Sequence, residues 1–189
     1  MWASMTELIN KSDIIGEFDY KKYCNIILSV LPSEFKGNLN AIHLVDKYDN
    51  EIGCDNDGYG CYIATNDNGI IFINIKNLSI YKIPSYLYKK YPEISALFLS
   101  EIVGHEFGHH VNAFHVKKIC DKEEFANKYA ESCYFYYIKK RKLYIYMSYY
   151  LASINLFMFN HNDRMMFKKS IEDIMRWIDD NKYIDFPKE

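Results

Sequence analysis

The segment with the clearest potential for chemistry is LSEIVGHEFGHHVNAFH, residues 99–115. It contains the pattern H-E-x-x-H at His105, Glu106 and His109. Residues four apart lie one turn apart on the same face of an α-helix, so two neutral imidazoles at these positions can bind one Zn²⁺ ion. Glu106 lies beside them, where it can act as a general base. The spacing therefore predicts a zinc site on a helix.

Two histidines on a helix can also be core residues whose ring nitrogens are satisfied by hydrogen bonds. The glutamate between them favours the metal site, because a structural histidine pair does not require it. Ile94, Phe98 and Ile102 lie on the same helical stripe as His105 and His109. The two imidazoles are therefore expected to project inward from the helix.

A catalytic zinc site has three protein ligands and one open position. The preferred third ligand is Glu123, in the segment EEFANKYAE. On a second helix, Ala126 and Ala130 mark a face that another helix can approach closely. Gly108 allows some other group to approach the first helix closely. Glu123 and Asn127 share that face, so Asn127 is able to hold the far nitrogen of a histidine ligand.

His115 is the competing third ligand. It lies ten residues after His105 and completes a pattern close to the metzincin pattern H-E-x-x-H-x-x-G-x-x-H. Asn112 replaces the glycine of that pattern, and asparagine also adopts the left-handed conformation that turns the chain. His110 points about 140° away from His105 and is assigned to the surface or to a second layer around the site.

The length of the first helix decides whether Glu123 can reach the ion. A helix continuing to His115 would extend about 9 Å past His109 and carry the chain away from the site. We therefore expect that helix to end near Asn112, with a loop before the second helix. Glu131, two turns further along, is the fallback carboxylate.

The residues before the motif are expected to form a helix and a small antiparallel sheet. The elements are a helix over 18–31, a strand over 39–48, and a hairpin with strands over 59–65 and 70–75. The pair Asn68-Gly69 is expected to supply the positive backbone angles of the hairpin turn.

The residues from the motif onward are expected to be helical. Pro92 suits the first turn of the motif helix, and Asp121 with Glu124 forms a capping box for a helix to about Lys140. A last amphipathic helix is expected over 165–178. The fold class is therefore α+β, with the sheet first and the helices packed on it.

Composition is typical of a globular protein: of 189 residues, 49% are hydrophobic and 25% are charged, with a net charge of −2. This balance indicates neither a nucleic-acid-binding surface nor an acidic tail. No repeat or linker divides the chain. One domain is expected over 1–189, with a sheet-containing part at about 15–80 and a helical part at about 84–182.

The cytoplasm is the expected location. Five cysteines without C-x-x-C spacing indicate no disulfide framework and favour a reducing compartment, and the N-terminus lacks the apolar run of a signal peptide. Residues 143–160 carry no charge and follow KKRK, as a marginal membrane span would. Tyrosine, serine and asparagine dilute their hydrophobicity, so a buried or interface helix is favoured.

Three segments together resemble the ImmA/IrrE-like family of gluzincin-type zinc peptidases. They are IFIN at 71–74, HEFGH at 105–109 and EEFANKYA at 123–130. The resemblance spans about residues 40–135, although CYFYY replaces the typical ending of the third segment. It implies a zincin-like fold, intracellular proteolysis of a specific protein, and a zinc ligand set of His105, His109 and Glu123 with Glu106 as general base.

The expected function is that of a zinc-dependent metalloendopeptidase in which Glu106 acts as general base on a zinc-bound water. The substrate is a protein or peptide expected to add as a strand to the sheet edge at Ile70–Ile75. Neither nucleic acid nor a membrane is an expected partner. The alternatives are a zinc-stabilised binding or sensing module without proteolytic activity, and a metzincin-type peptidase that uses His115.

Overall fold

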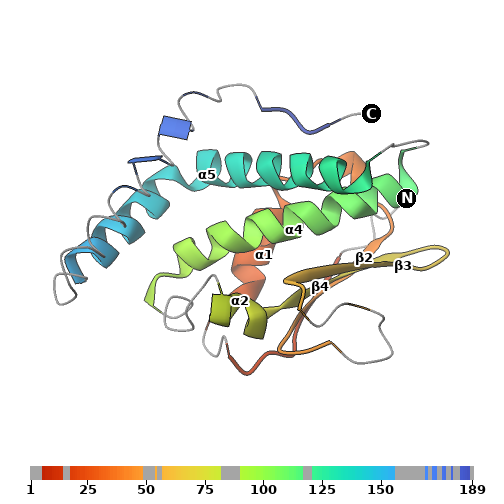
Figure 1. The fold of residues 1–189 in the computed structure, drawn as a ribbon, viewed down its shortest axis with the longest axis horizontal. Coiled ribbons are helices and arrows are strands. Elements are labelled where there is room, and N and C mark those ends of the chain that lie inside the picture. Colours follow the sequence, from red (N-terminus) through yellow and green to blue (C-terminus); the bar gives the residue numbers. More distant parts are fainter. Residues whose placement is uncertain are drawn as a thin grey trace.

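The computed structural model describes residues 6–14, 18–48, 54, 57–81, 90–116, 121–155, 169, 172–173, 176–177, 180 and 184–187. The strands are β1 (Glu7–Asn10), β2 (Leu39–Val45), β3 (Gly60–Ala64) and β4 (Gly69–Asn74). The helices are α1 (Tyr20–Leu28), the 3-10 turn η1 (Ser33–Phe35), α2 (Ile75–Tyr81), α4 (Pro92–Phe114) and α5 (Lys122–Asn155). The chain therefore has the predicted α+β plan, with the sheet first and two long helices after it (Figure 1).

The sheet is mixed and mostly parallel, so the prediction of an antiparallel sheet is wrong. Its strand order is β1-β2-β4-β3, in which β1 and β4 both run parallel to β2 and only the β3–β4 hairpin is antiparallel. The predicted sheet lacks β1, a four-residue strand that pairs Leu8 with Ile42 and lies before the residues expected to form the sheet. Helix α1 then connects β1 to β2, and such a crossover makes the two strands parallel.

Strand β4 lies inside the sheet, which corrects the prediction that Ile70–Ile75 forms its edge. Ile71 and Ile73 are fully buried, and β4 pairs with β2 on one side and with β3 on the other. A continuous apolar run is typical of a strand that is covered on both faces. The edge next to the motif helix is therefore β3, which contacts α4 directly.

The predicted hairpin forms, but its turn does not use the predicted backbone angles. Neither Asn68 nor Gly69 has a φ in the left-handed region. The turn is closed by Thr65, whose N–H and hydroxyl both donate to the carbonyl oxygen of Asn68, at 2.8 and 2.9 Å. Gly69 is required for space instead, because a Cβ there would collide with the Tyr62 hydroxyl.

Helices α4 and α5 pack against each other through small residues, as the sequence predicts (Figure 1). A Cβ on Gly108 would lie 2.6 Å from the α-carbon of Ala126, and one on Gly104 would lie 3.0 Å from that of Ala130. The pairing of 108 with 126 and of 104 with 130 makes the helices antiparallel. Their shared interface joins the main core between the helices and the sheet.

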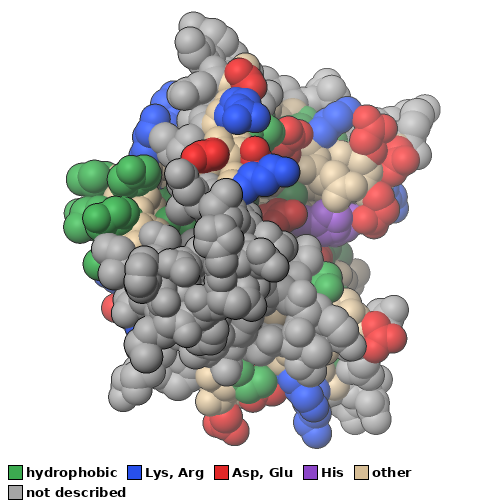
Figure 2. Space-filling model, turned by 60° about the vertical axis from the view of Figure 1, so that its left-hand side comes forward, with side chains coloured by type: hydrophobic (Ala, Val, Ile, Leu, Met, Phe, Trp, Pro, Cys, Tyr) green, Lys and Arg blue, Asp and Glu red, His purple; other side chains and the backbone are tan. Residues whose placement is uncertain are grey.

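Helix α5 is longer than predicted and continues through the first part of the uncharged stretch 143–160. Ile145, Tyr149 and Ala152 are buried on one face of this part. The opposite face carries exposed side chains, among them Leu143, which is 66% exposed, and hydrophobic groups gather at one edge of the surface in Figure 2. The expectation of a buried or interface helix therefore holds for one face of the described part.

None of the described helices combines the length and the hydrophobicity that a membrane span requires. In the helix predicted over 165–178, the described residues 169, 172–173 and 176–177 are helical, and the others lie outside the described part of the chain.

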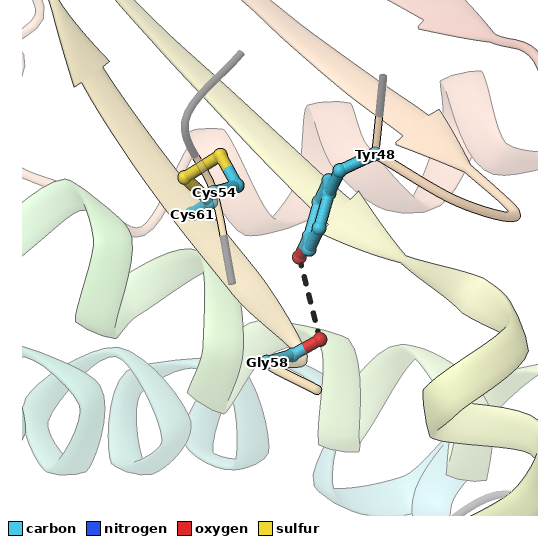
Figure 3. The surroundings of a disulfide bond; sticks show 4 residues. All are labelled: Tyr48, Cys54, Gly58 and Cys61. Atoms are coloured by element: carbon cyan, nitrogen blue, oxygen red, sulfur yellow. Dashed lines mark hydrogen bonds between the residues drawn. A yellow bond between two sulfur atoms is a disulfide. The ribbon is translucent and has the colours of Figure 1, made fainter. Parts of the chain in front are cut away.

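A disulfide joins Cys54 to Cys61, which corrects the prediction that no disulfide forms (Figure 3). The α-carbons of the two residues are 5.9 Å apart, and Cys61 belongs to β3. Inside the closed loop, the carbonyl oxygen of Gly58 accepts a hydrogen bond from the Tyr48 hydroxyl at 3.4 Å. The bond ties Cys54 to the edge strand, and no cysteine spacing in the sequence signals this pairing.

Candidate metal centre

His105 and His109 lie on one face of α4, and their Nε2 atoms are 3.1 Å apart. Their side chains are 25% and 20% exposed, so the pair is partly buried and still reaches solvent on one side. Burial, together with the neighbouring imidazole, lowers the pKa of His109 from its ordinary value. Its ring is therefore neutral at pH 7, which is the form that binds metal ions.

Glu123 supplies a carboxylate to the same point. Its oxygens lie 3.5 Å from Nε2 of His105 and 3.4 Å from Nε2 of His109. The three ligand atoms all lie within 4.8 Å of one another, so His105, His109 and Glu123 form a candidate metal-binding triad. Two imidazole nitrogens and one carboxylate oxygen match the donor set of many catalytic zinc sites, and they leave a fourth position for water or substrate.

The position of Glu123 follows from the overlap of the two helices. Helix α4 runs to Phe114, two residues beyond the predicted end at Asn112, yet Glu123 still reaches the histidines. Gly108 touches Ala126, which is three residues after Glu123. The first turn of α5 therefore lies beside the last turns of α4, and this overlap brings the Glu123 carboxylate to the histidines.

Asn127 fixes the ring of His105, as the sequence predicts. Its side-chain oxygen accepts a hydrogen bond from Nδ1 of His105 at 3.0 Å. Because this oxygen can only accept, the proton of the imidazole is on Nδ1 and the lone pair is on Nε2. Nε2 is the atom that faces His109 and Glu123. Asn127 thus holds His105 in the tautomer that a metal ligand requires.

Glu106 lies outside the triad, with its side chain packed against the first residue of β3. It is 6% exposed, and a Cβ on Gly60 would lie 2.9 Å from both Cγ and Cδ of Glu106. Burial raises the pKa of Glu106 to about 8, and the charge of the Glu123 carboxylate adds to the shift. The carboxyl group is therefore held beside the triad in a site from which most water is excluded.

A pocket of about 300 Å³ opens beside the triad, between β3, α4 and α5. The described residues that line it are Tyr59, Gly60, Glu101, Ile102, His105, Glu106, Asn127 and Ala130. It therefore adjoins both a candidate ligand and the buried carboxyl group.

The two competing ligands lie elsewhere. The ring of His115 packs 5.3 Å from that of Phe35 and 5.9 Å from that of His110, measured between ring centroids, and His115 is not part of the triad. Glu131 is exposed on α5 and is not part of the triad either. Among the alternatives that the sequence leaves open, the geometry favours Glu123.

His110 is fully buried on the sheet side of α4, so of its two predicted positions, the surface and a second layer around the site, the surface is excluded. Its Nε2–H donates to the carbonyl oxygens of Phe35 and Gly37, each at 3.1 Å, and its Nδ1 accepts from the Tyr62 hydroxyl at 3.1 Å. Burial lowers the pKa of His110 to about 4. This neutral, fully bonded imidazole connects the motif helix to the hairpin.

No protein-family model, curated protein sequence or solved structure significantly matches this chain.

Two parts of the site have no signal in the sequence, namely the contact of Gly60 with Glu106 and the lining of the pocket by Glu101. Both depend on where the hairpin lies relative to α4, and helical periodicity does not report that.

Proposed function

We propose that this chain is a zinc-dependent metalloendopeptidase of the gluzincin type that acts on a specific protein substrate. The observation that carries the proposal is the convergence of His105, His109 and Glu123 on one point beside the buried carboxyl group of Glu106. A purely structural metal site does not need that carboxyl group. The resemblance of three segments to the ImmA/IrrE-like family supports the same function.

In this proposal His105, His109 and Glu123 hold the ion. Bound Zn²⁺ would polarise the scissile carbonyl and make a coordinated water more acidic. The positive charge of the bound ion would favour the ionised form of Glu106. This carboxylate would accept the proton of the attacking water and return it to the leaving amine, as a general base and then a general acid. Asn127 keeps the lone pair of His105 directed at the ion.

The substrate backbone would bind along the outer edge of β3. In the described part of the chain, β3 pairs only with β4, so its other edge offers backbone N–H and C=O groups to an added strand. Gly60, the first residue of β3, touches Glu106. A peptide on this edge would therefore pass directly beside the general base.

The test is the Glu106→Gln variant, assayed for zinc content and for cleavage of unfolded protein substrates. Zinc content should be unchanged, because Glu106 is not a ligand in the triad. Cleavage should fall by about 10²–10⁴-fold, the usual contribution of a positioned acid–base group. Glu131→Gln, which removes an exposed carboxylate of α5, is the matched control and should keep full activity.

Two results would reject the proposal. One is full cleavage by Glu106→Gln protein. The other is wild-type protein that binds zinc in a 1:1 ratio and cleaves none of the substrates, which would favour a zinc-stabilised binding module.

A further inference from the structure

The pocket beside the triad is small, and its wall has both apolar and charged parts. Its volume of about 300 Å³ is at the low end of the range for ligand pockets, so it suits a single side chain better than a larger ligand. Ile102 and Ala130 form the apolar part of its wall, and Tyr59 and Gly60 connect the pocket to the edge strand β3. A peptide bound along β3 would direct one of its side chains into this pocket.

Glu101 provides the pocket with a carboxylate. It lies one helical turn before His105 on α4, so it faces the same side of the helix as the candidate ligand. Glu101 is partly buried and interacts electrostatically with Tyr134, and no described residue forms an ion pair or hydrogen bond with it. Among the described lining residues there is neither lysine nor arginine.

We propose that Glu101 is a specificity-determining residue that selects a lysine or arginine side chain of the substrate next to the scissile bond. This inference rests on the proposed peptidase function. The apolar wall accommodates the methylene stem of such a side chain, and the carboxylate pairs with its cationic end.

Other side chains fit the pocket less well. An acidic side chain would bring a second negative charge against Glu101 and close to Glu106. An apolar side chain would remove water from the Glu101 carboxylate without giving it a partner, which is unfavourable. The pocket therefore discriminates by charge as well as by size.

The test measures binding separately from cleavage. Zinc-loaded Glu106→Gln protein is titrated with fluorescent alanine peptides that carry one central arginine, norleucine or glutamate, and fluorescence anisotropy gives each Kd. The arginine peptide should bind at least about tenfold more tightly than the norleucine peptide, because a charge-assisted hydrogen bond is worth about one order of magnitude in affinity.

Three variants, each made in the Glu106→Gln background, assign the preference to one residue. Glu101→Gln should weaken binding of the arginine peptide by about tenfold and leave the norleucine peptide unchanged. Glu101→Lys should reverse the preference in favour of the glutamate peptide. Glu131→Gln removes an exposed carboxylate outside the pocket and should change none of the three affinities.

The inference is overturned by equal binding of the arginine and norleucine peptides, by no binding of either, or by a preference that survives in Glu101→Gln protein. Cleavage of the same peptides by wild-type protein separates the two proposals. Cleavage without selectivity for arginine leaves the peptidase proposal standing and rejects the role of Glu101. Selective binding without cleavage keeps the cation-selecting pocket and rejects the peptidase.

Discussion

The side-chain oxygen of Asn127 lies 3.0 Å from Nδ1 of His105, across the interface between α5 and α4. The helix that supplies Glu123 therefore also orients the first histidine of the motif. One interface thus brings together two parts of the site, the third ligand and the support of another ligand.

Replacing Asn127 by alanine should weaken zinc binding by about 10–100-fold, the usual effect of removing a hydrogen bond that supports a metal ligand. The imidazole of His105 would be free to rotate and to place its proton on Nε2. Competition with a chromophoric chelator measures the affinity. The neighbouring exposed variant Lys128→Ala should bind zinc as wild type does, and equal affinity in both variants would contradict the assigned role of Asn127.

Replacing Gly60 by alanine should lower the rate of peptide cleavage by about 10–100-fold while zinc content stays the same. The new methyl group would push against Cγ and Cδ of Glu106 and displace its carboxyl group, whereas the triad is not touched. Gly37→Ala is the control, because a Cβ at Gly37 meets no atom within 4 Å. A rate close to that of wild type in Gly60→Ala protein would show that the position of Glu106 is not critical.

Replacing Gly108 by alanine should destabilise the fold and weaken zinc binding together. The methyl group would meet the α-carbon of Ala126 and force the helices apart, at a cost of about 1–3 kcal/mol in the free energy of unfolding. Urea unfolding of the zinc-free protein gives the first quantity, and chelator competition gives the second. Ala113→Gly, on the exposed side of the last turn of α4, should cost less than about 1 kcal/mol through helix propensity alone and leave zinc affinity unchanged.

The carboxylate of Glu93 accepts hydrogen bonds from Arg141 Nε and from the Tyr137 hydroxyl, each at 3.2 Å, and forms an ion pair with Arg141. The Glu93 side chain is only 7% exposed. Arg141→Met should therefore lower the free energy of unfolding by about 3–5 kcal/mol, because it leaves a buried charge without its cation.

The double variant Glu93→Leu, Arg141→Met should recover most of that loss, since it removes both charges together. Urea unfolding of Glu93→Leu, Arg141→Met and the double variant gives the coupling energy between the two residues. Lys142→Met, an exposed change one residue away, should alter the free energy of unfolding by no more than about 0.5 kcal/mol. Additive losses in the double variant would contradict a direct interaction.

Local features of the sequence predicted the parts of the site whose geometry is set within one helical turn. The H-E-x-x-H spacing places His105 and His109 together, as four residues span one helical turn. The capping interaction is equally local: the Glu124 N–H donates to the Asp121 side chain at 3.0 Å, where the sequence predicts the start of a helix. The small residues Gly108 and Ala126 signalled the close helix contact, because steric exclusion is a property of residue type.

The sequence alone determined the helical histidine pair and the α+β class, because residue type and helical periodicity encode these directly. It favoured Glu123 and Asn127 as partners of the pair, and the packing of α5 against α4 brings both side chains to the histidines. Only the tertiary structure decided that β4 lies inside the sheet, that β3 forms the edge beside Glu106, and that Cys54 pairs with Cys61. These features depend on contacts between segments far apart or folded back on each other. The periodicity of a single element carries no information about which neighbour it will meet.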